Sequence, residues 1–300
     1  RVGHVRAADH VSGGAAANAL LRALADSGVD PAELTPTGWY EGDSIDLADG
    51  AVVSSWTDLS GNARHATQAT GSLQPAFQRG VVAGRPAVYF DGARYLALPG
   101  VDTDYLGASL QGTVFVVYRA ADATTGAQRN LWGDAAARRL LWINNSTLLK
   151  ARSYDGVADD AQQTTWVGDW HLGLWMYDGV NVNCGHDNVD TSALVTAVSG
   201  AQTDANRQLL ISAAASIGLI GHMAALIFFS SALTEENRRR IARYLAQKYR
   251  INNLSTGPAW TNVYAVTRGA NHAQEFQVKH FSGGDAMALP YATGTAEHRT

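Results

Sequence analysis

The chain is poor in cysteine, and this shortage limits how it can be stabilised. Cys184 is the only cysteine among 300 residues, so no disulfide can form within the chain. A lone thiol is more often a small buried hydrophobe than a nucleophile. A chain of this length buries enough apolar surface to fold without crosslinks. The cysteine content therefore does not indicate a redox compartment.

Charge of one sign and long apolar runs are also missing. Lys and Arg number 23 and Asp and Glu 27, for a formal net charge of −4. No basic stripe exists to neutralise phosphates, so we expect no nucleic-acid partner. The longest apolar run, MAALIFF at 223–229, is far shorter than the roughly 20 residues of a spanning helix, so we expect no membrane insertion. The first residues, RVGHVRAADHVSGG, mix Arg, His and Asp and do not resemble a secretion signal.

The residues that are abundant indicate a β-rich protein. Glycine occurs 30 times, Trp and Tyr occur 8 and 11 times, and proline only 7 times. Short apolar runs separated by Gly, Asn and Asp are typical of strands joined by turns. The predicted strands are 51–56, 86–91, 94–98, 112–119, 139–143, 147–154, 171–177, 207–213 and 221–229. Because no long helices separate them, we predict an antiparallel sandwich or barrel.

Two segments have helical patterns. Residues 13–28 carry Leu20, Leu21 and Leu24 at helical spacing, and Asp30 precedes Pro31 as a natural N-cap, so a small helical arm is predicted over 14–35. Residues 234–250 form an amphipathic helix capped by Thr234. Its apolar stripe, Ile241, Tyr244, Leu245 and Tyr249, is expected to lie on the sandwich or on a neighbour.

Three regions are predicted along the chain. Residues 1–37 form the N-terminal helical arm, 38–251 the sandwich, and 252–300 a C-terminal extension with strands at 260–266 and 275–281 and a polar end that frays. The boundary near Asn252 follows from the linker-like composition of 252–258.

The order of motifs resembles the laminin-G-like branch of the concanavalin A-like lectin/glucanase superfamily. The residues that carry it are SSWTDLSGN at 54–62, RPAVYFDG at 85–92, GTVFVVYRA at 112–120 and the strand and helix from 220 to 251. The resemblance covers about residues 38–251, and within it residues 120–210 match only in the spacing of their apolar runs and turns. It implies a jelly-roll sandwich of two antiparallel sheets. In such domains Trp56 packs inside and Asp58 accepts hydrogen bonds from the Ser60-Gly61-Asn62 turn, so we interpret this segment as a structural corner.

Catalysis is the less favoured interpretation. Some relatives are glycoside hydrolases that place Glu-x-Asp-x-x-Glu on one strand, with two carboxylates ~5 Å apart. Here Glu41-Gly42-Asp43-Ser44-Ile45-Asp46 ends in Asp and lies in a loop before the first sandwich strand, so we predict a solvated turn. A glycoside hydrolase or polysaccharide lyase is kept as the alternative.

Metal sites are not assigned from the sequence. His171, His186 and His222 lie on or beside strands, where histidines are usually hydrogen-bonded structural groups rather than zinc ligands. Calcium is the ion that the resemblance implies. Loop acids such as Asp155, and the run from His186 to Asp190, are compatible with it but are common in any protein.

Carbohydrate binding is the preferred function. A sugar site needs an aromatic platform flanked by amides and acids. The glycan-binding candidates are Trp142, Asn144, Asn145, Tyr154 and Asp155, on two strands and their turn. The competing interpretation places Trp142 in the core and makes Asn144-Asn145 a hairpin turn.

The added ends suggest assembly. Neither the N-terminal arm nor the C-terminal extension can form a core alone, and such elements commonly dock on another subunit. The resemblance also implies tail, fibre or decoration modules of virions and bacterial surfaces. We therefore predict a non-catalytic, glycan-binding module of a virion or extracellular assembly, with other subunits and a polysaccharide as partners.

Overall fold

The computed structural model describes residues 28–121, 128–134, 136, 139–144, 148–154, 158–164, 168–187, 195–197, 206–212, 218–251, 260–268, 274–282 and 285–287. The chain divides into two compact units. Residues 28–255 form the larger one, and 1–27 with 256–300 form the other. Among the residues that the structure describes, no helix is long and apolar enough to cross a membrane.

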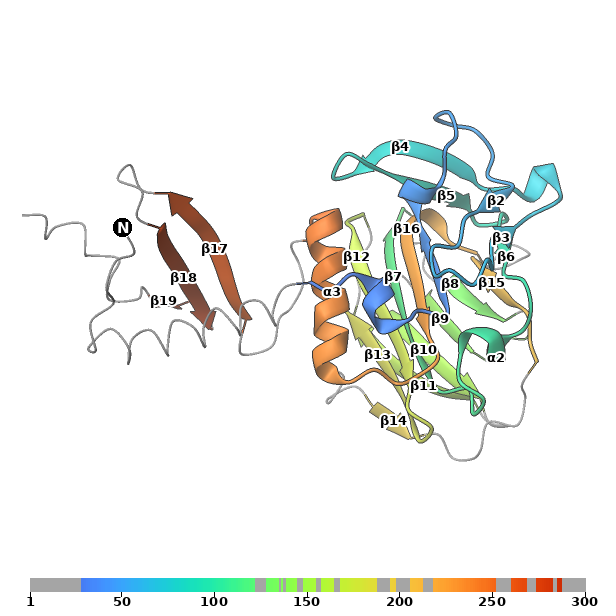
Figure 1. Cartoon of the computed structure of the whole chain (residues 1–300). Helices are drawn as coiled ribbons and strands as arrows, with labels where there is room; N and C mark the ends of the chain where they lie inside the picture. Colours follow the sequence, from blue (N-terminus) through green and yellow to red (C-terminus); the bar gives the residue numbers. More distant parts are fainter. Residues whose placement is uncertain are drawn as a thin grey trace, which may run out of the picture. The chain divides into compact units, whose positions relative to one another are not determined.

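The larger unit contains two eight-stranded sheets, called sheets A and B here (Figure 1). Sheet A has the order β14 (Val195–Ala197), β13 (Asn181–His186), β12 (His171–Tyr177), β7 (Gly112–Ala120), β16 (Ile220–Phe229), β5 (Arg85–Asp91) and β4 (Ala76–Val82), and β1 (Gly38–Glu41) also pairs with β16. Sheet B has the order β11 (Ala158–Thr164), β10 (Leu148–Tyr154), β9 (Leu140–Asn144), β8 (Gln128–Asp134), β15 (Leu209–Ile211), β6 (Leu96–Ala97), β3 (Ala66–Thr67) and β2 (Ser55–Trp56). The pairings of these named strands are antiparallel.

Apolar side chains of both sheets form the main core. Strand β7 shows how alternation sorts them: Val114 and Val116 point into this core, whereas Phe115 points to the other face of sheet A. Trp132 of sheet B and Trp175 of sheet A meet edge to face with ring centroids 5.3 Å apart. The two sheets are therefore layers of one sandwich.

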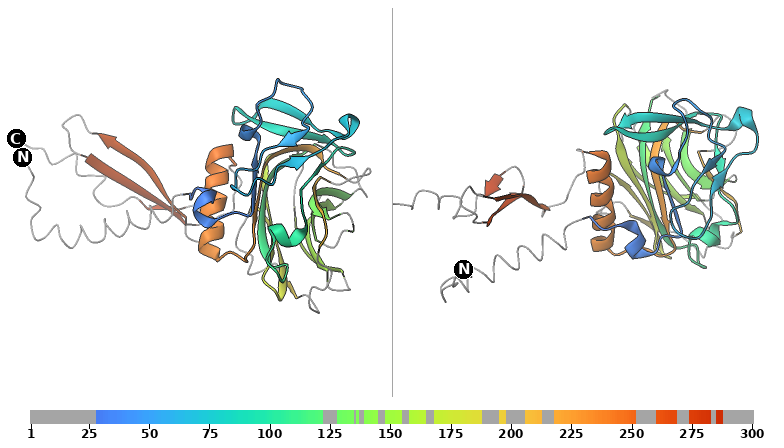
Figure 2. Two further views of the ribbon diagram at one scale, coloured as in Figure 1. Left: turned by 45° about the vertical axis from the view of Figure 1, so that its right-hand side comes forward. Right: turned by 45° about the horizontal axis from the view of Figure 1, so that its top comes forward.

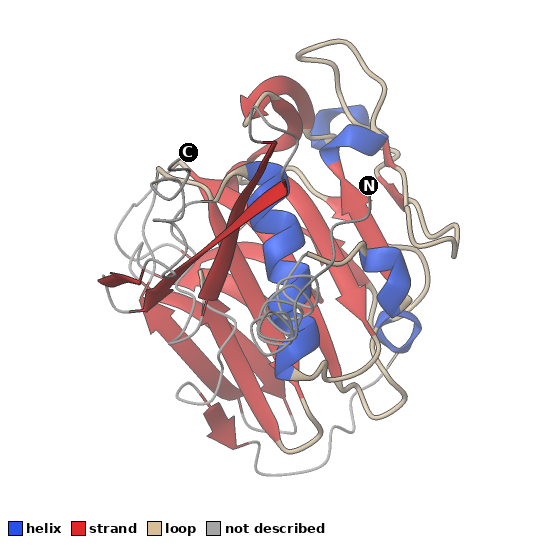
Figure 3. Cartoon of the chain, turned by 60° about the vertical axis from the view of Figure 1, so that its left-hand side comes forward, coloured by secondary structure: helices blue, strands red, loops and turns tan. Residues whose placement is uncertain are grey.

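Helix α3 (Glu235–Tyr249) covers the outer face of sheet A (Figures 2 and 3). The Thr234 side chain accepts from the Asn237 N–H and caps its first turn, and Arg250 ends it in the left-handed conformation. The predicted stripe is confirmed, because Ile241, Leu245 and Tyr249 are buried in a second cluster with the outward side chains of β7 and β16, and Tyr244 packs against it. The outward side chains Leu140, Trp142 and Leu210 of sheet B are buried but belong to neither of these two clusters.

Short turns complete the unit. They are η1 (Pro31–Leu34), η2 (Gly42–Ser44), η3 (Gly71–Leu73) and α2 (Asp102–Tyr105). Asp30 caps η1 as predicted, with its carboxylate accepting from the Ala32 N–H at 3.0 Å. The rest of the predicted N-terminal helix, residues 14–27, lies outside the described residues.

The all-β antiparallel sandwich predicted from the sequence is confirmed, and so is its single long helix. The predicted strands 51–56 and 94–98 shrink to Ser55–Trp56 and Leu96–Ala97. Strands β1, β3, β8, β11, β13 and β14 were missed. β11 has the sequence ADDAQQT, which lacks the apolar alternation on which the prediction depends, and backbone pairing with β10 forms it instead.

The smaller unit contains one antiparallel sheet in the order β17 (Trp260–Arg268), β18 (Gln274–Ser282) and β19 (Asp285–Met287). The strands predicted at 260–266 and 275–281 are thus confirmed. The domain boundaries predicted at 37 and 251 stay predictions.

Candidate functional site

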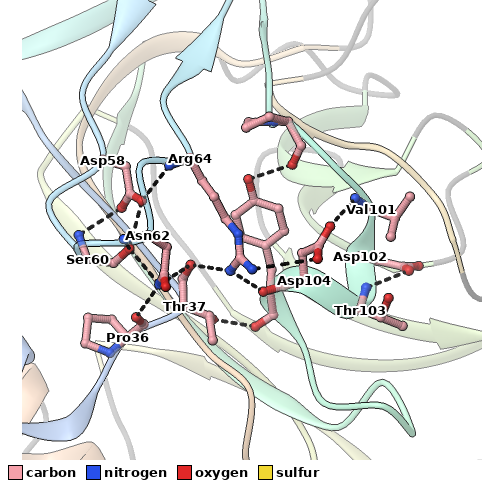
Figure 4. A network of polar contacts seen from close by, with 12 residues as sticks. Pro36, Thr37, Asp58, Ser60, Asn62, Arg64, Val101, Asp102, Thr103 and Asp104 are labelled. Atoms are coloured by element: carbon pink, nitrogen blue, oxygen red, sulfur yellow. Dashed lines mark hydrogen bonds and ion pairs between the residues drawn. The ribbon is translucent and has the colours of Figure 1, made fainter.

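The segment from Trp56 to Arg64 is a hydrogen-bonded corner, drawn in Figure 4. Asp58 Oδ1 accepts from the backbone N–H groups of Trp39 and Ser60, both at 2.9 Å. Its Oδ2 accepts from the Ser60 hydroxyl at 2.8 Å and from the Arg64 N–H at 3.0 Å. The Trp56 side chain is fully buried. Both carboxylate oxygens of Asp58 accept hydrogen bonds that hold the backbone of this segment in place. The geometry therefore agrees with the interpretation as a structural corner.

Arg64 extends this corner to α2 (Figure 4). Its guanidinium donates to the Thr37 carbonyl at 2.9 Å and to the Asp104 carbonyl, and it lies 5.2 Å from the centre of the Tyr105 ring. Burial raises the pKa of Tyr105 to about 12, so the phenol stays neutral at ordinary pH. The corner is thus a structural joint between β2, the segment before β1, and α2.

The catalytic alternative placed its acids at Glu41 and Asp43, which the structure joins to α3. Glu41 is 2% exposed, and its carboxylate accepts from Lys248 and, at 3.0 Å, from the Tyr244 hydroxyl. Asp43 pairs with Arg85 at 2.7 Å and with Lys248 at 3.2 Å. The prediction of a solvated turn before the first sandwich strand is therefore wrong for Glu41, which is the last residue of β1 and pairs with Ala225 of β16. The cause is a contact with a helix 207 residues away in sequence, which local composition does not reveal.

Trp142 of the predicted glycan site lies in sheet B, and its side chain is outside the main core. Its neighbours Leu141 and Ile143 point into the core, so alternation directs Trp142 to the outer face. The ring is 4% exposed because two cations from β10 cover it: the Arg152 guanidinium lies 4.9 Å and the Lys150 ammonium 5.9 Å from its centre. The Trp142 indole is therefore covered by two cations and does not offer an open surface on which a sugar ring could stack.

The other candidates are only partly described. Asn144 is half-buried at the end of β9, on the face of Trp142. Asn145 and Asp155 lie outside the described residues, as does the side chain of Tyr154. The glycan site therefore stays a prediction.

Further polar side chains share this outer face of sheet B. Register places Asn130 of β8 opposite Trp142 and Gln128 opposite Asn144, and directly opposite residues point to the same side. Gln128 donates a side-chain hydrogen bond to Asn130 at 2.7 Å. Strand β8 was not predicted from the sequence, although its amide residues at i and i+2 follow the period of two that is typical of a strand.

Histidines occur in two buried settings. His222 on β16 accepts from Arg119 at Nδ1 (3.3 Å) and donates from Nε2 to Gln78 (2.7 Å), and burial with the Arg119 charge lowers its pKa to about 4. This is the structural role expected for it. His171 and His186 instead lie together beside Asp187, with ring centroids 4.6 Å apart. Burial lowers the pKa of His186 to about 4. Sequence analysis named both residues but did not bring them together.

Two further buried groups are structural. The Cys184 thiol donates to the Leu149 carbonyl at 3.4 Å, and burial raises its pKa, so it is an inert core group as predicted. Arg139 pairs with Asp102 at 2.8 Å inside the unit. This pair was not predicted from the sequence, because its two residues lie 37 positions apart.

No protein-family model matches the chain, and no curated protein matches it in sequence. Similar solved structures include domain 4 of AbnA, a GH43 extracellular arabinanase from Geobacillus stearothermophilus, in complex with arabinotriose. That domain is 17% identical, with a TM-score of 0.47, over 69% of this chain and 98% of the domain. Trypanosoma rangeli sialidase in complex with the inhibitor DANA is 13% identical, with a TM-score of 0.49, over 72% of this chain.

The sialidase match covers only 35% of the sialidase chain. A mutant of HCR/D is 7% identical, with a TM-score of 0.50, over 87% of this chain and 74% of that one. At this identity the likeness to the HCR/D mutant shows the fold alone, and the finer family stays a prediction.

Proposed function

We propose that the protein is a non-catalytic, carbohydrate-binding β-sandwich module of the concanavalin A-like, laminin-G-like type. The observation that carries this is the difference between the two outer faces. Helix α3 and its apolar cluster cover the outer face of sheet A. The outer face of sheet B instead carries amides and two cations, namely Gln128, Asn144, Lys150 and Arg152, around the buried Asn130 and Trp142. A polar sheet face of this composition is suited to a hydroxyl-rich ligand.

The cations suggest an acidic polysaccharide. The Arg152 guanidinium and the Lys150 ammonium both lie over the Trp142 ring, so this part of the face carries positive charge. The Lys150 ammonium has no ion pair or hydrogen bond with a described residue and is half-buried beside it. In this proposal the Lys150 ammonium, held beside Trp142, contacts a carboxylate of the sugar, while Asn144 contacts hydroxyls.

The pairing of Glu41 and Asp43 with basic residues supports a non-catalytic role. A general acid or nucleophile must reach the substrate, and Glu41 is nearly inaccessible and bound to Lys248 and Tyr244. We extend the proposal to the location: a module of a virion or extracellular assembly, in which the C-terminal strands attach to other subunits.

A glycan array with neutral, uronate-containing and sulfated polysaccharides tests this proposal, together with an assay of reducing-end release. We expect salt-sensitive binding to acidic chains and no turnover. The double substitution Lys150→Ala with Arg152→Ala should weaken binding at least about tenfold, or ~1.4 kcal/mol. Arg79→Ala, an exposed cation on β4 of sheet A, is the matched control and should bind normally.

Turnover that disappears with Glu41→Gln would instead establish the hydrolase alternative. Binding restricted to neutral glycans, or unchanged in the double variant, would place the ligand elsewhere.

A further inference from the structure

The buried cluster of His171, His186 and Asp187 offers a metal site, and we propose that it binds a divalent transition-metal ion of the zinc class. His171 is the first residue of β12, His186 is the last residue of β13, and Asp187 follows directly. One ligand atom from each residue lies within 4.8 Å of the others. Within the described part of the chain, this is the only group of three His, Cys, Asp or Glu side chains with such spacing.

Strand register brings the two imidazoles together. His186 lies opposite Gly173, two residues after His171 on the same strand, so both histidines point to one face of sheet A. That face is the inner one, because the residue opposite His171 is Tyr118, a member of the main core. The side chains of the cluster are 1–4% exposed. The cluster therefore lies at the end of two paired strands, inside the sandwich.

The distances around Asp187 Oδ2 suit a shared ion. This oxygen lies 2.6 Å from His171 Nδ1 and 3.9 Å from His186 Nε2. Ligand atoms about 2.1 Å from a tetrahedral ion lie roughly 3.4 Å from one another, which falls between these two values. The three ligand atoms lie within 4.8 Å of one another, so shifts of about 1–1.5 Å would bring them all to coordination distance.

The backbone holds the carboxylate in place. Asp187 Oδ1 accepts from the Leu172 N–H at 2.7 Å, and the Asp187 N–H donates to the Leu172 carbonyl at 2.8 Å. Asp187 itself has φ +49°, a left-handed conformation that costs energy for a residue with a side chain. This conformation leaves Oδ2 directed at the two rings.

The donor set selects the kind of ion. Two imidazole nitrogens and one carboxylate oxygen suit zinc, nickel or cobalt, whereas calcium prefers six to eight oxygens. A buried carboxylate also needs a compensating positive charge, which a divalent ion supplies. The bound ion would join the start of β12 to the end of β13.

Metal titration of the full chain tests this proposal. After chelator treatment, Co²⁺ is added and the visible d–d absorption of the protein-bound ion is recorded. We expect saturation at one equivalent, displacement of Co²⁺ by Zn²⁺, and a rise of a few degrees in Tm with Zn²⁺. X-ray absorption on the zinc-loaded wild type should show two imidazole ligands.

Two variants and a control identify the site. His186→Gln leaves the bond between His171 and Asp187 intact and should abolish the cobalt absorption and the rise in Tm, as should His171→Gln. His222→Gln, another buried histidine, should retain both. The control matters because the chain has nine histidines. The absence of saturable binding in the wild type, fewer than two imidazoles in its X-ray absorption, or binding retained in both variants would overturn the proposal.

Discussion

Arg139 and Asp102 form an ion pair with an Nη1–Oδ2 distance of 2.8 Å, and both side chains are fully shielded from solvent. The other carboxylate oxygen of Asp102 accepts from the N–H groups of Thr103 and Asn206, each at 2.9 Å. Asp134 accepts from the Arg139 N–H at 2.8 Å. The pair therefore ties the end of the β8–β9 hairpin to α2 and to the chain before β15.

Arg139→Met should destabilise the protein strongly. It leaves the Asp102 carboxylate buried without its cation, and breaking a buried pair from one side costs about 3–5 kcal/mol. Urea denaturation measures the change. The exposed pair between Arg239 and Glu235 on α3 is the control, and Arg239→Ala should cost less than about 0.5 kcal/mol. Equal losses in the two variants would contradict a special role for the buried pair.

Asp58→Asn should weaken the corner without unfolding the sandwich. One of the two acceptor oxygens becomes an NH₂ group that faces N–H donors, and losing hydrogen bonds to a charged acceptor costs roughly 1.5–3 kcal/mol. Thermal unfolding measures the loss. Asn62→Ala removes only exposed or part-buried bonds, at 3.0–3.3 Å, and should cost less than about 1 kcal/mol. A larger effect at Asn62 than at Asp58 would refute this account.

Lys248→Met should loosen the docking of α3. The Glu41 carboxylate would lose its cation and keep the Tyr244 hydroxyl at 3.0 Å, so we expect a loss of about 2–4 kcal/mol. Adding Glu41→Gln removes the unpaired negative charge and should recover part of the lost stability. Denaturant unfolding of the two single variants and the double variant gives the coupling energy. Strictly additive losses would mean that the two residues do not interact.

His222 makes the stability depend on pH. Its folded pKa is about 4, below the ordinary value of 6.5, so between these values the unfolded chain binds more protons than the folded one. The free energy of unfolding should therefore fall as the pH drops from about 6.5 to about 4. His222→Gln can keep the contact with Gln78 and should reduce this fall by roughly 1–2 kcal/mol. Denaturant midpoints at several pH values, compared between the two proteins, measure the difference; identical pH dependence would exclude His222 as the cause.

Much of the fold was predictable because the relevant interactions are local. The strands β5, β7, β12 and β16 are runs of apolar residues bounded by turn residues. Thr234 caps α3 from the preceding position, and Asp58 bonds a hydroxyl two residues away. In contrast, β11 was missed because its residues are mostly polar and it forms by pairing with β10.

The candidate sites were much less predictable. Trp142 was expected to be an aromatic platform, but its ring is covered by Lys150 and Arg152 from the neighbouring strand. These residues were known from the sequence, yet alternation shows only which face a side chain occupies. It does not show which side chains of the next strand lie above it, since that depends on register.

The sequence alone determined the spacing of the strands, the amphipathic helix and the corner, because each depends on residues a few positions apart. The tertiary structure decided which charges and histidines meet. Glu41 reaches Lys248 across 207 residues, Asp102 reaches Arg139 across 37, and His171 reaches Asp187 only after β12 and β13 pair in register. Such contacts form because strand pairing and helix docking bury the residues together, and local sequence patterns carry no record of that pairing.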